Sequence, residues 1–254
     1  LVTAVLALVI LLGGVRRIAD AATVLVPVMA LLYIGGGLAV ILGNLRRLPE
    51  AVTLMLRCAV APEAALGGAL GIVTRREALR WGVARSVFSN EAGLGSAAIT
   101  AACADTEDPV KQGLISMTGV FFDTMVICTV TGLAICCSGT LGTADGAGRP
   151  LTGAALTLRA FETVLGPLAP WLIGVALGLF AFTSVLGCAV QAETTASYLL
   201  GPEAVRPCRV LYGLAVFAGA VIPMATVLQL ADLANALMAF PNLVCLLLLS
   251  GEIA

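Results

Sequence analysis

The sequence predicts an all-α protein that crosses a membrane several times. Hydrophobic residues fill 60% of the 254 positions and charged residues only 11%, whereas soluble domains carry about 25% charged residues. Mean hydropathy is +1.06. A soluble domain of this size must cover its surface with polar groups, which this composition cannot supply, and lipid removes that requirement. Apolar runs recur along the chain and are predicted to be transmembrane helices, because helices satisfy their own backbone hydrogen bonds in lipid.

The first two predicted spans lie near the start of the chain. A spanning helix needs about 20 mostly apolar residues, because roughly 30 Å of hydrocarbon is crossed at about 1.5 Å per residue. Residues 1–15 form one run and residues 24–43 a full-length one. The chain begins inside an apolar run without a Met, so we expect a fragment of a longer protein. A short amphipathic stretch, residues 51–60, is expected at the membrane interface.

Residues 61–103 do not look like an ordinary span. Their first part is apolar but too short to cross as a straight helix, and it contains Gly67, Gly68 and Gly71. A second glycine-rich stretch, Ser89–Ser96, reads Ser-Asn-Glu-Ala-Gly-Leu-Gly-Ser. Irregular backbone at membrane depth is tolerated where it lines a cavity, and the free ends of broken helices bind ions and polar solutes. Both stretches are therefore candidate binding segments.

Each glycine-rich stretch also has a structural alternative. Gly67, Gly68 and Gly71 could serve close helix packing, since small residues are common at membrane helix interfaces. The second stretch could be a cytoplasmic loop in which Asn90 caps a helix and Glu91 lies in its first turn. The residue pattern leaves both alternatives open.

Regular spans return after this region. Residues 138–153 are an aqueous loop rich in Gly, Thr and Asp. An amphipathic helix is predicted over residues 154–166, with Arg159 and Glu162 on one face. A more polar stretch, residues 190–201, continues the predicted span at residues 168–188. The four predicted spans of this part are residues 113–137, 168–188, 209–225 and 228–249.

Lysine and arginine are distributed unevenly between the predicted loops. If residues 61–103 cross the membrane once, nine of the 14 Lys and Arg side chains share one side and five the other. If this region does not cross, the division becomes ten against four in a different arrangement. The side with more positive charge is expected to be cytoplasmic, but this rule does not choose between the two arrangements.

The composition argues against several classes of function. Histidine is absent and no basic run occurs, so we expect neither an imidazole base nor nucleic-acid binding. No Ser/Lys or metal-ligand set lies at a membrane depth suited to catalysis, so we do not expect an enzyme. The eight cysteines form no matched CxxC pairs. They are interpreted as reduced, buried thiols rather than a zinc site or a disulfide framework.

Asp123 is the most costly residue of the predicted spans. A carboxylate at a helix centre costs about 2.5–3.5 kcal/mol on insertion scales. It must therefore meet a partner, a cavity or a proton, which would suit an ion pair or a gating contact near a transport path. Alternatively, Asp123 lies about three turns into its span and water reaches it without a special role.

Thr183 and Ser184 are adjacent hydroxyl residues inside an apolar span. Hydroxyl oxygens are neutral ligands for a hard cation such as Na⁺. In membrane helices, however, Ser and Thr commonly hydrogen-bond to the carbonyl of residue i−4. The pattern alone favours this second role.

Several segments together resemble a known family. Residues 82–96, Gly-Val-Ala-Arg-Ser-Val-Phe-Ser-Asn-Glu-Ala-Gly-Leu-Gly-Ser, resemble the signature of the sodium:alanine (alanine/glycine:cation) symporter family. The resemblance covers essentially the whole chain. It continues through residues 13–33, 108–113, 119–124, 151–157, 230–235 and 241–243.

The resemblance implies a LeuT-like fold of two inverted five-helix repeats, of which this chain holds the second. Helix 6 of that fold is broken and crosses the membrane, which selects the arrangement of nine positive charges against five. The first repeat, with the other broken helix, would lie outside residues 1–254. The implied assignment is the end of helix 4 at residues 1–15, helix 5 at 24–43, broken helix 6 with a cytoplasmic segment at 61–103, helix 7 at 113–137, helix 8 at 168–188, helix 9 at 209–225 and helix 10 at 228–249.

The resemblance also implies site residues. Related transporters of this fold use two hydroxyls on helix 8 for sodium, and Thr183 and Ser184 fall at that place. The unwound point of helix 6 fits the first glycine-rich stretch, whereas the second would lie near the cytoplasmic face as a gate. The family usually shows Gly-Trp where this chain has Gly187-Cys188, so the substrate pocket is expected to be larger there. The expected substrate-binding residues are Gly67, Gly68, Gly71, Ser89, Asn90, Glu91, Gly93 and Cys188.

These implications define an expected function. The chain is expected to belong to a multi-pass transporter of the cell membrane, the bacterial inner membrane, that takes up a small neutral amino acid with Na⁺. Its expected partners are that amino acid, Na⁺ and the lipid bilayer, with no cofactor beyond the coupling ion. One alternative is H⁺ coupling or a larger neutral substrate, motivated by Cys188. Another is a membrane sensor or structural homologue that does not transport.

Overall fold

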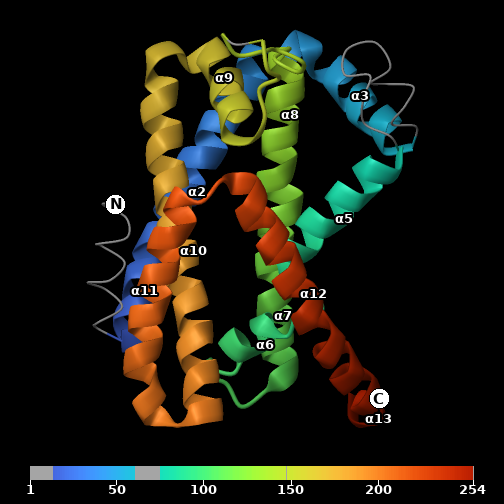
Figure 1. Cartoon of the computed structure of the whole chain (residues 1–254). Helices are drawn as coiled ribbons and strands as arrows, with labels where there is room; N and C mark the ends of the chain where they lie inside the picture. Colours follow the sequence, from blue (N-terminus) through green and yellow to red (C-terminus); the bar gives the residue numbers. More distant parts are fainter. Residues whose placement is uncertain (1–13, 61–74, 147, 254) are drawn as a thin grey trace. The chain divides into compact units, whose positions relative to one another are not determined.

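The computed structural model describes residues 14–60, 75–146 and 148–253 (Figure 1). Apart from one isolated bridge between Ala144 and Pro150, the regular structure of these residues is helical. Most of the predicted run at residues 1–15, and the first glycine-rich stretch, lie outside the described residues. The helices long and apolar enough to cross a membrane are Ala22–Gly43, Pro109–Ser138, Gly153–Leu200, Pro202–Val221 and Met224–Leu248. The all-α, multi-pass membrane class is therefore confirmed.

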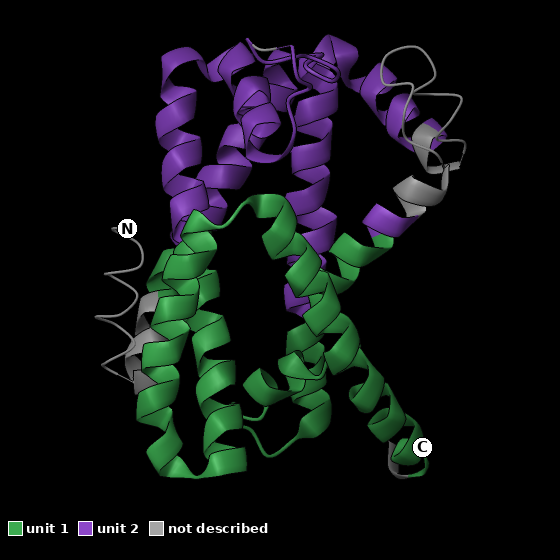
Figure 2. Cartoon of the chain, viewed as in Figure 1, with its two compact units in different colours: residues 1–25, 83–117, 180–254 green, residues 26–82, 118–179 purple. Residues whose placement is uncertain are grey.

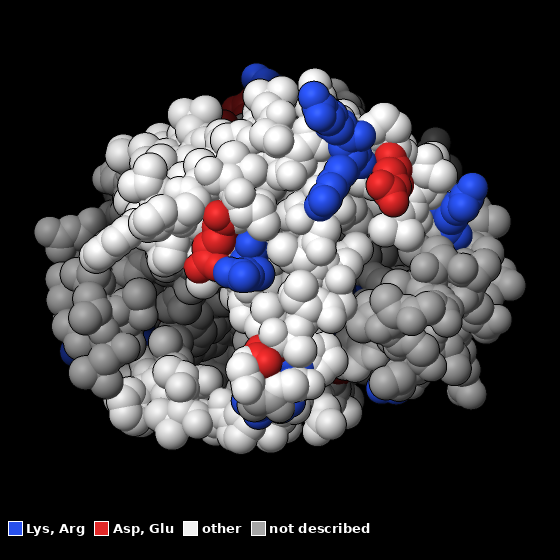
Figure 3. Space-filling view, turned by 90° about the horizontal axis from the view of Figure 1, so that it is seen from above, with Lys and Arg blue, Asp and Glu red and all other residues white. Residues whose placement is uncertain are grey.

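The surfaces of these helices match lipid rather than water. Leu31 is 73% exposed, Trp171 77% and Leu247 76%. Uncharged residues form most of the face shown in Figure 3, with charged side chains in isolated places. A water-soluble monomer rarely exposes such contiguous apolar surface, whereas hydrocarbon solvates it without cost.

The chain divides into two compact units, coloured separately in Figure 2. Unit 1 contains residues 1–25, 83–117 and 180–254, and unit 2 contains residues 26–82 and 118–179. Long helices contribute residues to both units, so the boundaries fall inside continuous elements.

Unit 2 packs around α9 (Gly153–Leu165) and the part of α2 (Gly14–Gly43) that begins at residue 26. Phe161 is fully buried, and its ring centroid lies 5.7 Å from that of Tyr33. Glycines of α2 permit this close approach: a Cβ atom at Gly37 would lie 2.3 Å from Cγ1 of Val130. Tyr33 also shares a 2.9 Å hydrogen bond with the Thr131 hydroxyl.

A second helix pair completes unit 2. After the turn η1 (Leu45–Arg47), α3 (Leu48–Val60) contacts α8 (Thr129–Ser138). On α9, Arg159 and Glu162 form the predicted ion pair, with 3.1 Å between Nη1 and Oε2. Helix α9 then leads through η3 (Gly166–Leu168) into α10 (Ala169–Leu200).

The span at Pro109–Ser138 is not a uniform α-helix. It begins as α7 (Pro109–Val120), continues as the π-helical segment η2 (Phe121–Cys128) and ends as α8. Asp123 lies in the π-helical segment and is half-buried. Wider π turns inside α-helices often occur at functional sites, and the apolar pattern of this span gives no sign of them.

Unit 1 contains a tight antiparallel hairpin of α10 and α11 (Val205–Val221), joined by η4 (Pro202–Ala204) (Figure 1). Its core is formed by Phe182, Leu186, Ala189 and Val190. The Tyr212 hydroxyl donates to the carbonyl of Val185 at 2.8 Å. The last long helix, α12 (Met224–Leu248), precedes the short α13 (Ser250–Ile253).

Unit 1 also contains the end of α5 (Arg75–Asn90) and the short α6 (Ser96–Ala101). Asn90 is the last residue of α5, and Glu91 follows it in a turn. The alternative in which Asn90 caps the start of a helix, with Glu91 in its first turn, is therefore wrong. Gly95 takes the position before α6 instead, with φ of 82°.

Candidate functional site

The turn between α5 and α6, Glu91–Gly95, is called the signature loop below. Three of its residues have positive φ: Glu91 at 51°, Gly93 at 73° and Gly95 at 82°. Glycine adopts these angles without steric cost, whereas a residue with a Cβ atom adopts them only at a steric cost. Among the described residues, Glu91 is the one non-glycine residue in this region of φ. Such a backbone persists only where its surroundings hold it.

Hydrogen bonds hold the Glu91 carboxylate between α6 and α10. The buried Ser96 hydroxyl donates to Oε2 at 2.6 Å. The Gln191 amide lies 3.2 Å from Oε1 and 3.1 Å from Oε2, and 3.2 Å from the Thr100 hydroxyl. The carboxylate oxygens of Glu91 thus accept hydrogen bonds from both Ser96 and Gln191.

Helix α12 holds the signature loop on another side. The Asn242 amide donates to the carbonyl of Gly93 at 3.1 Å. A Cβ atom at Gly95 would lie 2.8 Å from Oδ1 of Asn242, so only glycine fits there without a shift. An ion pair between Arg85 and Asp232 joins α5 to the same helix. The loop is thus fixed by side chains more than 90 residues away in sequence.

One face of α10 leads away from this cluster. Ser184, Cys188 and Gln191 have the spacing i, i+4 and i+7, which places them on one helical face. Ser184 and Cys188 are exposed. At about 1.5 Å per residue, Ser184 lies about 10 Å along the helix from Gln191. A polar stripe therefore runs from the hydroxyl of Ser184 to the Glu91 carboxylate.

Thr183 lies beside this stripe rather than on it. Its hydroxyl donates to the carbonyl of Phe180 at 3.1 Å, a back-bond to residue i−3. The alternative from the sequence was a back-bond to the carbonyl of residue i−4, and the structure shows a back-bond to residue i−3.

The other expected site residues are placed as follows. Gly67, Gly68 and Gly71 lie outside the described residues. Ser89 is exposed and Asn90 half-buried at the end of α5, so both adjoin the loop. Asp123 belongs to unit 2, whereas Glu91, Gly93, Cys188 and the hydroxyl pair belong to unit 1. Within unit 1, the structure brings the signature loop onto α10 through the hydrogen bonds between Glu91 and Gln191.

Sequence reasoning missed the partners of the loop. Gln191, Asn242, Arg85 and Asp232 were not singled out, although Asp232 lies within a predicted span just as Asp123 does. A search for charged residues inside spans would have found it, because such residues are costly unless paired. Glu193 lies outside the predicted spans, in the polar stretch 190–201, yet it is 7% exposed and bound by Arg209 at 2.7 and 2.9 Å.

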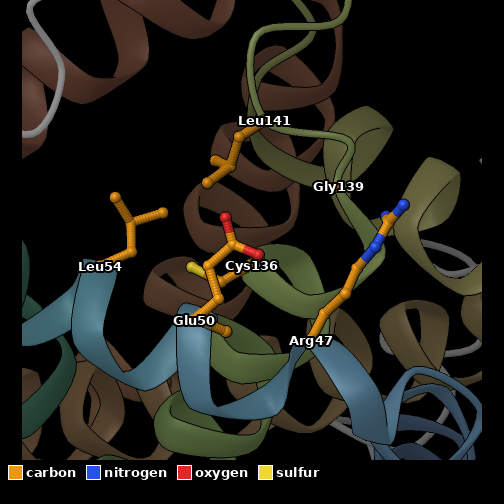
Figure 4. A pocket seen from close by; sticks show the side chains of 7 residues that line it. Arg47, Glu50, Leu54, Cys136, Gly139 and Leu141 are labelled. Carbon is orange, nitrogen blue, oxygen red and sulfur yellow. The ribbon is translucent and has the colours of Figure 1, made fainter.

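Unit 2 has a cavity of about 360 Å³ at the turn from α2 into α3 (Figure 4). The Glu50 side chain points toward Cys136, and the Arg47 side chain extends toward Gly139. Nη1 of Arg47 donates to the carbonyl of Ser138 at 3.4 Å, at the C-terminal end of α8. Arg47 therefore satisfies a helix end, as cationic side chains do at C-termini. The lining of the cavity is completed by Ala51, Leu54 and Leu141.

Comparisons with a family model and with individual known proteins agree with each other. The model of the sodium:alanine symporter family matches residues 1–254. An uncharacterized transporter of Haemophilus influenzae is 44% identical over 239 residues, covering 94% of this chain and 51% of that protein. The sodium/alanine symporter AgcS of Methanococcus maripaludis is 39% identical over 255 residues, covering 99% and 54%. A probable sodium/glutamine symporter, GlnT of Bacillus subtilis, is 39% identical over 245 residues, covering 95% and 48%. The chain spans about half the length of these relatives.

Proposed function

Because this chain belongs to the sodium:alanine symporter family, we propose that the gene product containing it takes up a small neutral amino acid together with Na⁺. The observation that carries the proposal is the family match over the whole chain, whose described residues include five helices of membrane-spanning length and composition. Two relatives with known or probable substrates are named for sodium with alanine and sodium with glutamine. Both amino acids are neutral, which supports that class. Transport of this kind breaks no covalent bond.

The proposed architecture is the second half of a LeuT-like five-plus-five inverted repeat. In this assignment α2 is helix 5, α5 with the signature loop belongs to helix 6 and its cytoplasmic segment, and α7 to α8 form helix 7. Helices α10, α11 and α12 are helices 8, 9 and 10. The order of long apolar helices along residues 22–248 supports the assignment.

The proposed Na⁺ ligands are the hydroxyl oxygens of Thr183 and Ser184. They are supported by their adjacent positions on α10 and by the exposure of Ser184. On the face of α10 that carries Ser184, the next side chains are the Cys188 thiol and the Gln191 amide. Neutral oxygens suit a hard cation that must later be released.

The proposed substrate contacts include the signature loop and the α10 face beside it. Ser89, Asn90, Glu91 and Gly93 belong to the loop or adjoin it, and Cys188 faces the same side of α10 as Gln191. Gly67, Gly68 and Gly71 are proposed as the unwound point of helix 6. Asp123, half-buried in a π-helical segment, is proposed as an intramembrane gating charge.

Reconstitution of the complete gene product in liposomes tests this function. Uptake of labelled alanine, glycine and glutamine is measured under separate Na⁺, K⁺ and pH gradients. We expect uptake of a neutral amino acid driven by the Na⁺ gradient and not by K⁺. Uptake driven by pH alone would favour H⁺ coupling, and preference for glutamine would favour the larger pocket suggested by Cys188. Absence of uptake under every gradient would favour a sensor or structural homologue.

A further inference from the structure

Helix α12 is attached to the rest of unit 1 mainly through polar contacts. None of its residues is buried. In the described residues, its side-chain hydrogen bonds and ion pairs to other elements go to one segment: Asp232 to Arg85 on α5, and Asn242 to Gly93 in the signature loop. Asp232 and Asn242 are ten residues apart, which is about 15 Å along a helix. The helix therefore holds α5 and the loop at two separate points.

Two polar contacts form a weak and reversible attachment. Lipid tails solvate the apolar face of a membrane helix as well as another helix does, so apolar contact gives little drive for association. Detaching α12 would thus cost mainly the two polar contacts. The loop that it holds contains the strained φ of Glu91, and strained backbone at a site favours rearrangement once its restraints are removed.

We propose that α12 is the latch of the signature loop, with Asn242 and Asp232 as its positioning residues. The latch is closed when Asn242 binds the Gly93 carbonyl and Asp232 pairs with Arg85. Release of both contacts lets the loop leave α12 while Gln191 still holds Glu91 to α10. This inference rests on the proposed function, because it assigns the loop a step of the transport cycle.

Glycine at position 95 supports this assignment independently of the hydrogen bonds. The Cα of Gly95 approaches Asn242 so closely that a Cβ would lie 2.8 Å from Oδ1 and 3.1 Å from Cγ. Gly93 is also near α12, since its Cβ position lies 3.7 Å from Leu243. The loop surface is therefore shaped to fit this particular turn of α12.

The test measures exposure of the loop in the complete gene product. The native cysteines are replaced by serine, and Ala92, which is exposed in the loop, is changed to Cys. The rate of maleimide labelling is measured in proteoliposomes. Asn242→Leu removes the amide donor at similar size and is expected to raise the labelling rate about threefold to tenfold, as expected for one lost hydrogen bond.

Asn235→Leu is the matched control. Asn235 lies two turns earlier on α12 and on the same helical face, and no hydrogen bond is recorded for it among the described residues. We expect labelling at the parent rate. If Asn242→Leu also labels at the parent rate, or if both variants label faster by the same factor, the latch is wrong.

Charge reversal tests the second contact. Arg85→Asp and Asp232→Arg alone are each expected to raise labelling, and the double variant is expected to return toward the parent rate. Additive effects of the two changes would overturn the role of this ion pair in the latch. The labelling result does not need transport, so it stays readable if uptake fails, and failure of uptake alone would count against the proposed function instead.

Discussion

Glu91 combines two costs in one residue. Its φ of 51° strains the backbone, and its carboxylate is half-buried in a membrane protein. Strained φ values of this kind cost about 1–3 kcal/mol. The hydrogen bonds that Ser96 and Gln191 donate to Glu91 offset these costs. Removal of either donor should therefore destabilise the conformation of Glu91.

Gln191→Met is expected to destabilise the protein by about 1.5 kcal/mol, the lower end for a bond to a charged group, because Glu91 is only half-buried. Thermal melting in detergent measures this change. Thr194→Ala, three residues further along α10 and exposed, is the control and should leave the melting temperature near that of the parent. Equal melting temperatures for the two variants would contradict the account of the Glu91 cluster.

The hydroxyl pair makes a separate prediction at the residue scale. Replacing Thr183 and Ser184 together by Ala removes both proposed cation ligands. The Na⁺ concentration for half-maximal uptake should then rise at least tenfold. Uptake assays at graded Na⁺ measure this, and an unchanged Na⁺ requirement would reject the site.

These residue contacts show where sequence reasoning stopped. The segment from Ser89 to Ser96 was recognisable, and the glycines at 93 and 95 were expected to leave helical geometry. The positive φ of Glu91 was not predictable, because glutamate is not a turn residue. Its partner Gln191 lies 100 residues away, and no local pattern announces such a pair.

At the scale of elements, α2 depends on glycine for its close contacts. Gly37→Ala would place a Cβ 2.3 Å from Val130, and overpacking of this kind costs about 1–3 kcal/mol. Gly35→Ala is the matched control, since nothing lies within 4 Å of its Cβ position. The control should be neutral or slightly stabilising, because alanine favours a helix interior. Melting temperatures of the two variants test the packing, and equal values would contradict it.

The α10–α11 hairpin depends on a buried ion pair. Glu193 is 8% exposed and Arg209 25% exposed at the side chain. Arg209→Met leaves the carboxylate buried without its cation, and such a loss costs about 3–5 kcal/mol. Glu193→Leu together with Arg209→Met should recover most of the melting temperature. A double variant as unstable as Arg209→Met would show that the cost has another source.

Some elements could be predicted from the sequence and others could not, for physical reasons. Long apolar runs announce spanning helices, because lipid demands about 20 apolar residues. The prediction that Arg159 and Glu162 lie on one face of an amphipathic helix was also correct, since the two side chains form an ion pair. The π-helical segment around Asp123 was not predicted, because a wider turn changes the hydrogen-bond register without changing the apolar pattern.

At the scale of the whole molecule, composition indicates the solvent and the sequence match indicates the family. The 11% charged residues point to lipid, but composition does not distinguish a transporter from a sensor. The match over residues 1–254 shows the family, and transport by the complete gene product is proposed from it. The proposed half of a repeat fold further implies that this chain contributes one side of a transport site.

Coupled flux is the most direct measurement of the central claim. The complete gene product is reconstituted in liposomes, and influx of labelled Na⁺ is measured with and without alanine, glycine or glutamine outside. Because a symporter carries both solutes in one cycle, a neutral amino acid should accelerate Na⁺ influx just as Na⁺ accelerates amino-acid uptake. Na⁺ influx that is the same with and without every neutral amino acid would contradict the account.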